Sequence, residues 1–279
     1  NYDGGIICRL GSSPSIQNCT LTNNKSKSGG GLAIEDNCSP QVLRTTINNN
    51  MAPSGGGVFI RNGSFPTFTD CTIQGNSIDA ANGSGGGVAI VNASPTFTNC
   101  SILDNSADGF GGGLSVLDSS TLNMTGCVVR GNRTLADSAP GGGFYAEFSD
   151  LILEDCVIAD NMLDGYNSEG SAIYLSFAFA TNLHQCTIAE NAVNGLPSTA
   201  GVISCFYSSP TISQSIIAHN SPGVAIVCVE PSSTPTISCT DLYGNQGGNG
   251  TGWIDGGHNF YLDPLFCDLA SDNYRLQLN

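Results

Sequence analysis

The sequence predicts an all-β fold, a single right-handed parallel β-helix of about nine coils. Three patterns predict this fold, and each recurs with a period of roughly thirty residues. The first is a cysteine followed by an apolar residue two places later and an asparagine five places later, the second a glycine run before alternating apolar residues, and the third a Ser-Pro-Thr-Phe-Thr-Asn segment before the cysteine. Short strands that cannot bury a face alone must stack on copies of themselves.

The first strand of each coil is expected directly after the glycines. Residues 85–87 are all glycine, and Val88 and Ile90 behind them have the two-residue period of a strand. Glycine permits the sharp bend that must come before this strand. The positions of this strand that are expected to face outward are Ala33, Phe59, Ala89, Ser115, Tyr145, Tyr174 and Ile203.

A second short strand is expected around the cysteine. Over residues 97–102 the side chains alternate between apolar and polar, and Pro95 opens the segment. Proline is tolerated at the first residue of a strand, where no ladder donor is needed. Because identical positions of stacked coils fall above one another, Phe68 should lie against Phe97.

An asparagine turn is expected after this second strand. Asparagine tolerates the left-handed backbone conformation, and its carboxamide can hydrogen-bond to the copies above and below it. The expected structural ladders contain Asn76, Asn105, Asn132, Asn161 and Asn191, and Cys19, Cys71, Cys100, Cys127, Cys156 and Cys186. The pattern fades at Cys239, after which Asn245 comes one place late.

The chain contains 12 cysteines. In the ladder we expect buried thiols that act as small apolar side chains, because parallel side chains fit disulfide geometry poorly. Cys205 and Cys228 follow the glycine bends of adjacent coils and could be bridged by a disulfide. A zinc site is not expected, because no Cys-x-x-Cys and no close Cys/His pair occurs.

Composition limits the partners. The chain has 8 Lys and Arg against 23 Asp and Glu, a net charge of −15. This charge argues against nucleic acid and anionic membranes as partners, and it suits a secreted or surface protein. No apolar run approaches the roughly 18 residues of a membrane span.

The repeats occupy residues 1–245, and residues 246–279 are expected to form a closing segment packed on the last coil. Because the chain begins inside a repeat, we expect a mature or trimmed segment of a longer protein.

Two known groups share these motifs. Gly-Gly-Gly-Val-Ala-Ile at 85–90, with Ile102-x-x-Asn105, resembles the Gly-Gly-Ala-Ile and Phe-x-x-Asn repeats of chlamydial-type polymorphic outer-membrane proteins, with Gly in place of Ala and Ile in place of Phe. Over residues 4–245 the chain is similar to β-helix repeat proteins of the pectin-lyase-like superfamily. The resemblance implies an extracellular or cell-surface location and says little about activity.

No catalytic residue is predicted. A pectate-lyase-like site would need several carboxylates for calcium beside an Arg or Lys, and a polygalacturonase-like site would need clustered aspartates with a His; neither cluster is visible. Asp160 and Glu190 should lie on adjacent coils near Asp164. Together they could hold Ca²⁺ if backbone carbonyls completed the shell, or they could be solvated turn charges.

Aromatic side chains give a different candidate site. Tyr145 and Tyr174 are expected to stack on the outward face, with Phe59 three coils away. Exposed aromatic rings can bind the apolar faces of sugars or a partner protein, whereas loops rich in Gly and Ser could instead cover them.

The sequence therefore favours a non-catalytic extracellular or cell-surface β-helix, an adhesin-like passenger, stalk or filament building block with a lateral face suited to glycan. The alternative is a polysaccharide lyase or glycoside hydrolase of the pectin-lyase-like fold. Expected partners are a polysaccharide, the surface of a host or neighbouring cell, and further copies of the chain joined end to end. No cofactor is expected apart from the Ca²⁺ considered above.

Overall fold

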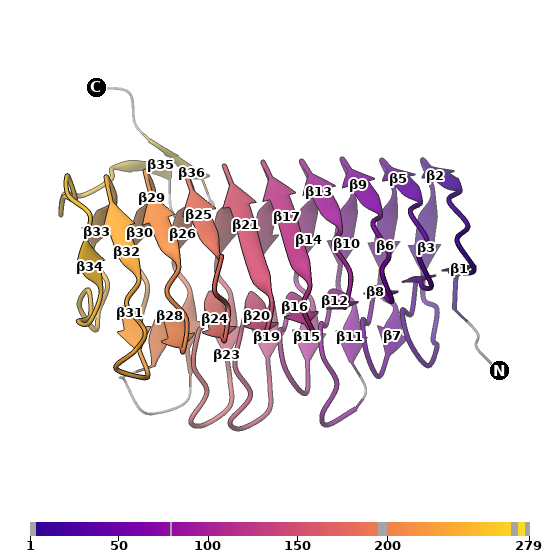
Figure 1. The fold of residues 1–279 in the computed structure, drawn as a ribbon, viewed down its shortest axis with the longest axis horizontal. Coiled ribbons are helices and arrows are strands. Elements are labelled where there is room, and N and C mark those ends of the chain that lie inside the picture. The colour runs from indigo at the N-terminus through magenta and orange to yellow at the C-terminus, as the bar shows by residue number, and fades with distance from the viewer. Residues whose placement is uncertain (1–3, 79, 195–199, 269–272, 277–279) are drawn as a thin grey trace.

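The computed structural model describes residues 4–78, 80–194, 200–268 and 273–276. These residues form a rod of stacked coils whose strands pair in parallel along four sheets (Figure 1). The rod is a right-handed parallel β-helix, as predicted. No helix occurs among the described residues.

Each coil contributes strands to sheets A, B and C in turn, and six of the middle coils add a short strand of sheet D. Sheet A, which follows the glycines, contains β1 (Ile6–Cys8), β4 (Leu32–Ile34), β8 (Val58–Arg61), β12 (Val88–Val91), β16 (Leu114–Leu117), β20 (Phe144–Glu147), β24 (Ile173–Ser176), β28 (Gly201–Phe206) and β31 (Val224–Cys228). Sheet B contains β2 (Ser15–Gln17), β5 (Gln41–Leu43), β9 (Thr67–Thr69), β13 (Thr96–Thr98), β17 (Thr121–Thr125), β21 (Asp150–Glu154), β25 (Asn182–His184), β29 (Thr211–Ser213), β32 (Thr236–Ser238) and β34 (Ile254–Asp255).

The other two sheets follow the cysteine position. Sheet C contains β3 (Thr20–Thr22), β6 (Thr46–Asn48), β10 (Thr72–Gln74), β14 (Ser101–Leu103), β18 (Val128–Arg130), β22 (Val157–Ala159), β26 (Thr187–Ala189), β30 (Ile216–Ala218) and β33 (Asp241–Tyr243). Sheet D contains β7 (Met51–Ala52), β11 (Ser77–Ile78), β15 (Ser106–Ala107), β19 (Arg133–Thr134), β23 (Met162–Leu163) and β27 (Ala192–Val193). An antiparallel pair, β35 (Phe266–Asp268) and β36 (Asn273–Leu276), follows the last coil.

The interior is a set of continuous columns. Phe68 and Phe97 are paired in register, and their rings stack with centroids 4.5 Å apart and planes within 4°. Ile73 and Ile102 are paired in the same way and are fully buried. Burying such a side chain stabilises the fold by about 1.5–3 kcal/mol. The predicted stacking of equivalent residues is therefore confirmed.

The strand expected across the cysteine is broken in two. The residue before each cysteine has a left-handed backbone, with φ of 51° at both Asp70 and Asn99. This bend separates sheet B from sheet C, and it lets Phe97 and Ile102 both point into the core from different directions.

The asparagine ladder forms, but its backbone differs from the prediction. Asn76 Nδ2 donates to Asn105 Oδ1 at 3.0 Å and to the Ile47 carbonyl at 2.9 Å. The left-handed residue is the one before each asparagine, as at Gly75 (φ 61°). The prediction of a left-handed asparagine is wrong because the carboxamide must point inward between coils, and only the preceding residue can make the turn.

The last coil also departs from the sequence assignment. Cys239 lies in the left-handed position and is exposed, whereas Thr240 is buried and accepts a hydrogen bond from the Ser215 amide at 3.4 Å. Thr240 therefore takes the ladder position. Asn245 then follows at the regular spacing, and it accepts from Asn220 Nδ2 at 2.8 Å.

The C-terminal segment does more than close the last coil. Trp253 packs against the core, and β34 extends sheet B by one strand. The hairpin β35–β36 then folds back on the outer side of sheet C (Figure 1), where Phe266 packs with Ala189 and Ala218 of two earlier coils. The hairpin thus covers part of the outer side of sheet C, which is otherwise regular.

Candidate ligand-binding face

The outer side of sheet A is covered at the candidate ring positions, which agrees with the second of the two alternatives left open by the sequence. Phe59 is 7% exposed and Tyr145 is 8% exposed, and Tyr174 is half-buried. The stacking of Tyr145 on Tyr174 is confirmed at 5.7 Å, but Phe110 from the loop before residues 111–113 covers Tyr145 at 5.1 Å. Phe59 and Tyr145 therefore do not form an exposed platform.

One outward position was assigned to the wrong residue. Tyr174 pairs with Ser204, while Ile203 pairs with the inward Ile173 and is fully buried. The shift arises because the later coils have lost most of their glycines, so that counting from Gly201 misplaces the bend.

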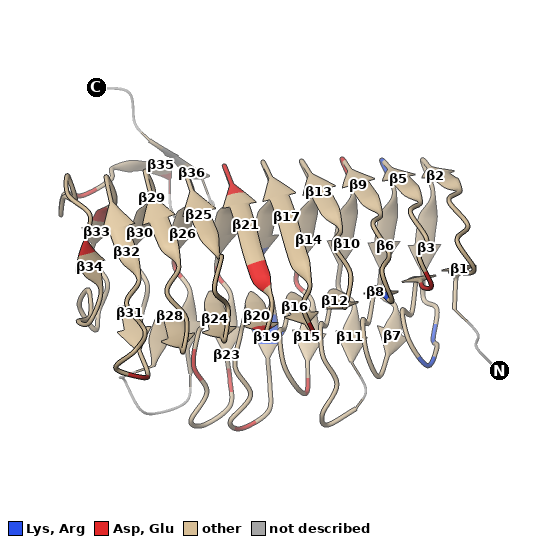
Figure 2. Cartoon of the chain, viewed as in Figure 1, with Lys and Arg blue, Asp and Glu red and all other residues tan. Residues whose placement is uncertain are grey.

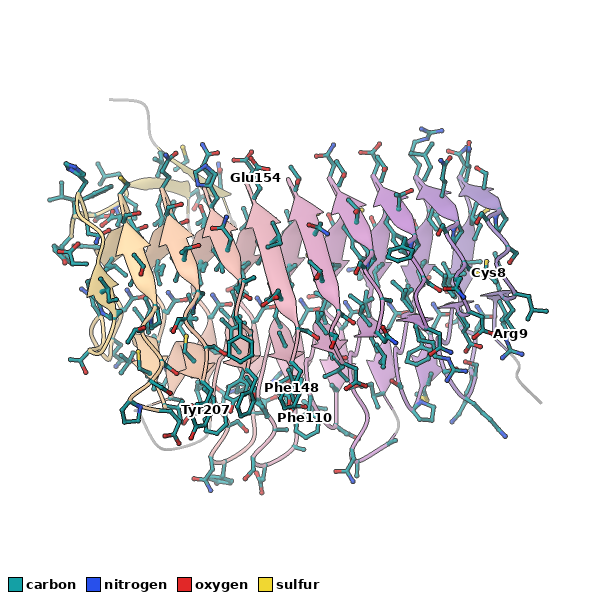
Figure 3. All side chains as sticks on the ribbon, in the orientation of Figure 1. Cys8, Arg9, Phe110, Phe148, Glu154 and Tyr207 are labelled. Carbon is teal, nitrogen blue, oxygen red and sulfur yellow. The ribbon has the colours of Figure 1, made fainter. Side chains whose placement is uncertain are left out.

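An exposed set of rings that the sequence analysis missed lies at the end of the strands of sheet A. Phe148, Phe177 and Tyr207 stack on successive coils with centroids 4.8 Å and 4.9 Å apart and planes within 8°. Phe148 is 53% exposed and Tyr207 is 41% exposed. We call these three residues the aromatic row; Phe148 and Tyr207 are labelled in Figure 3.

The aromatic row occupies strained backbone positions. Its members have φ of 49°, 52° and 48°, a region that bulky side chains rarely adopt. The equivalent positions in earlier coils are small polar residues that suit this conformation: Asp36, Asn62, Asn92 and Asp118. Aligning the coils on sheet A would have revealed this replacement. Such strain costs about 1–3 kcal/mol per residue and is typical of functional sites.

A pocket of about 220 Å³ lies beside the aromatic row. Phe206 lines it and stands nearly perpendicular to Tyr207, at 4.7 Å and 84°. The residues that line this pocket are Ser138, Pro140, Asn167, Glu169, Tyr174, Phe206 and Val229. We call it the Glu169 pocket. It combines two aromatic rings with one carboxylate and two small polar side chains.

The electrostatics of the Glu169 pocket follow from burial. Glu169 Oε2 is buried and has no hydrogen-bond partner. Burial raises the pKa of Glu169, which the nearby Ser204 hydroxyl offsets only in part. Burial and the charges of Glu169 and Glu147 raise the pKa of Tyr174 to about 12, so its hydroxyl is neutral at physiological pH.

The candidate calcium ligands do not converge. Asp160 and Glu190 lie on adjacent coils as predicted, but the Tyr274 hydroxyl is within hydrogen-bonding distance of both, at 3.1 Å and 2.9 Å. Asp164 instead pairs with Arg133 at 2.7 Å after a strand of sheet D. Within the described ranges, no group of three or more His, Cys, Asp or Glu side chains could hold a metal ion. Asp164 was misplaced because a further strand, β23, separates it from Asp160.

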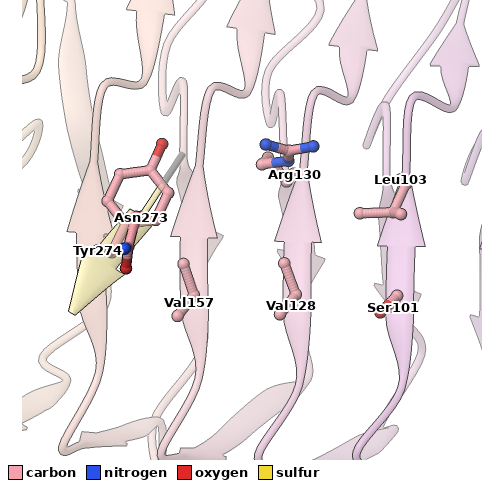
Figure 4. A pocket seen from close by; sticks show the side chains of 7 residues that line it. All are labelled: Ser101, Leu103, Val128, Arg130, Val157, Asn273 and Tyr274. Carbon is pink, nitrogen blue, oxygen red and sulfur yellow. The ribbon is translucent and has the colours of Figure 1, made fainter. Parts of the chain in front are cut away.

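A second hollow lies between the hairpin and sheet C (Figure 4). This groove of about 370 Å³ has an apolar floor that includes Val128 and Val157, with Arg130 and Tyr274 at its sides. Asp160 and Glu190 are connected to this groove by their contacts with the Tyr274 hydroxyl.

All 12 cysteines are free thiols. Cys205 and Cys228 are in register on β28 and β31, as the sequence suggested, but the bridge between them is not formed. Burial raises the pKa of both thiols and so lowers their reactivity. Of the six predicted ladder cysteines, five are buried and Cys19 is partly exposed.

The charge is spread along the rod. Acidic residues occupy turns, loops and some strand positions, such as the two ends of β21, while basic residues are few (Figure 2). Arg9 and Arg61 both contact the buried Glu35, at 3.0 Å and 3.2 Å. Each of these two arginines thus pairs with the buried Glu35 carboxylate, while its own side chain is 42% (Arg9) or 41% (Arg61) exposed.

A family model described as the right handed beta helix region matches residues 1–94 and 79–204. The chain therefore belongs to this β-helix family. Searches of curated proteins and of solved structures found no match. None of the described residues belongs to a helix that could span a bilayer.

Proposed function

We propose that this chain is a non-catalytic extracellular or cell-surface β-helix, adhesin-like, that binds carbohydrate on the outer side of sheet A. The observation that carries the proposal is the exposed aromatic row beside the Glu169 pocket. Contiguous exposed aromatic surface is typical of interaction sites.

The two parts of this face have different roles. The rings of the aromatic row stack face to face, so the row presents mainly ring edges to solvent. It thereby forms an apolar border beside the Glu169 pocket. Tyr174 and Phe206 offer ring surface inside the pocket, where a sugar can pack its apolar side. Ser138, Asn167 and Glu169 can then hydrogen-bond its hydroxyls, the usual division of labour in small-ligand sites.

The lining of the pocket supports binding rather than hydrolysis. Glycosidases of the common mechanisms need two carboxyl groups flanking the scissile bond. Glu169 is the single carboxylate among the residues that line the Glu169 pocket.

A polysaccharide lyase or glycoside hydrolase is the second candidate, and the groove beneath the hairpin favours it. Arg130 and Tyr274 line that groove, and Tyr274 contacts two carboxylates. A lyase should release unsaturated products from acidic polysaccharides that absorb in the ultraviolet, a hydrolase should release new reducing ends, and Arg130→Ala should abolish either product.

The test of the proposed function is a glycan array run beside that lyase assay. We expect glycan retention without product, and a roughly tenfold weaker affinity for Tyr207→Asn or Phe206→Ala, equivalent to about 1.4 kcal/mol. Asparagine at position 207 keeps the left-handed turn, as Asn62 and Asn92 do. Phe65→Ala, at an aromatic residue that is 57% exposed elsewhere, is the matched control. Product formation, or equal loss in the control, would contradict the proposal.

The other expected partners remain part of this proposal. Attachment to a host or neighbouring cell would follow from glycan binding. End-to-end self-association would place strands β1, β2 and β3 of one copy against the last coil of another, and sedimentation at increasing concentration tests it.

A further inference from the structure

We infer that the Glu169 pocket selects sugars without acid groups and prefers amino sugars that carry a free ammonium group. The inference rests on the proposed carbohydrate binding and names the class of sugar. Its basis is an unmet hydrogen-bond requirement combined with the charge around the pocket.

The unmet requirement is that of the Glu169 carboxylate. Its Oε2 atom is buried and forms no hydrogen bond, although the equally unpaired Ser204 hydroxyl lies nearby, and burial is the cause that raises the pKa of this group. A buried acceptor left unpaired costs about 1–3 kcal/mol, more when it is charged. A ligand in the pocket that brings a donor or a positive charge to this carboxylate offsets that cost. A sugar hydroxyl suffices, and an ammonium group satisfies both the hydrogen bond and the charge.

The surrounding charge selects against acid sugars. None of the seven residues that line the pocket is basic. The carboxylate of Glu147, on the neighbouring strand β20, adds to the negative potential at Tyr174. A uronate placed here would set its carboxylate against these two, and like charges a few ångströms apart repel. The net charge of −15 acts in the same direction.

The ring positions fix how such a sugar would lie. Tyr174 lines the pocket from β24 and Phe206 from β28, one coil further along the rod. Asn167 and Glu169 come from the loop that leads into β24. The sugar therefore has aromatic surface on the strand side and polar groups on the loop side, which orients its amino or hydroxyl substituent toward Glu169.

The experiment compares three oligosaccharides of equal length by titration calorimetry on the full chain: glucosamine, glucose and galacturonate oligomers. We expect affinity to fall in that order at neutral pH, with at least a tenfold gap between the first and the last. Glu169→Gln keeps the shape and the hydrogen bond but removes the charge, so it should lose the preference for glucosamine over glucose. Glu154→Gln, an exposed carboxylate on β21 labelled in Figure 3, is the matched control.

The outcomes separate the two claims. Tightest binding of galacturonate would overturn the inference and leave carbohydrate binding in place. Equal affinity for glucosamine and glucose, unchanged in Glu169→Gln, would also overturn it. Binding of none of the three, and of nothing on the array, would overturn the proposed function as well. Should Glu169→Gln unfold, Tyr174→Phe provides the second variant, because it keeps the ring while removing a polar group from the pocket, and it should weaken glucose and glucosamine alike.

Discussion

At the residue scale, the regular stacking of the coils depends on the buried asparagine ladder. The carboxamide of Asn132 is one of the buried ladder members: it donates to Asn161 and to the Ile102 carbonyl and accepts from both the backbone and the side chain of Asn105. The sequence predicted such a ladder from spacing alone. The left-handed turn one place earlier could not be assigned, because that position holds residues as different as Gly75 and Glu190.

Replacing Asn132 by alanine should lower the free energy of unfolding by roughly 3 kcal/mol, because it leaves buried donors and a buried carbonyl unpaired. Chemical denaturation followed by circular dichroism measures the change. Gln74→Ala, at an exposed position of strand β10, is the control and should cost less than about 0.5 kcal/mol. Equal losses in the two variants would refute the importance of the ladder.

The aromatic row gives a second residue-scale prediction. Phe177→Asn trades ring stacking for a side chain that suits φ of 52°, whereas Phe177→Val adds branching at the same angle. We expect the valine variant to be less stable than the asparagine variant by about 1 kcal/mol. Thermal unfolding of the two variants in parallel decides this. A valine variant as stable as asparagine would show that the position is not strained.

Among the elements, the hairpin β35–β36 was the hardest to foresee. It lies outside the repeat, so no neighbouring copy indicates its position, and its contacts cross from the end of the chain to coils far earlier in the sequence. Tyr274, for example, contacts Asp160, which is 114 residues away. The strands of sheets A, B and C, in contrast, each have eight or more copies to define them.

Docking of the hairpin should weaken in alkali. Burial, Asp160 and Glu190 raise the pKa of Tyr274 above its usual value. A released hairpin would ionise this tyrosine near pH 10 while the docked one stays protonated, so docking is fully favoured below about pH 10 and is lost as the pH rises beyond it. Hydrogen exchange of residues 273–276, corrected for intrinsic rates, should show this loss in the wild type. In Tyr274→Phe the same pH range should have a much smaller effect; an identical response would assign it to other groups.

On the scale of the whole molecule, the repeat predicted the fold and its direction of winding, but it did not indicate which aromatic side chains stay exposed. Loops between sheets D and A differ from coil to coil, and they decide that Tyr145 is covered while Phe148 is open. The exposed aromatic side chains therefore lie not on the strands of sheet A, where alternation placed them, but in the turn that follows these strands. Repetition determines what stacks, and departures from repetition determine what remains accessible.

The whole protein should be independent of disulfides. We expect a thiol reagent to label Cys239 and Cys267 rapidly in the folded protein, since both are exposed, and to label all 12 cysteines after denaturation without reductant. Buried ladder thiols should react only as the rod opens. A count of ten in the denatured, unreduced protein would reveal one bridge, with Cys205 and Cys228 the first pair to test by mass spectrometry.

Finally, the asparagine column has a polarity. From Asn24 to Asn220, each carboxamide donates toward the next coil and none donates backward to the preceding carboxamide. Their dipoles add along the axis, so the two directions along the column are chemically unlike: each carboxamide turns its acceptor oxygen toward the preceding carboxamide and its donor nitrogen toward the next one. Two rods meeting tip to tip could prolong this column only head to tail. Any fibre grown in that way would be vectorial, with distinct leading and trailing ends.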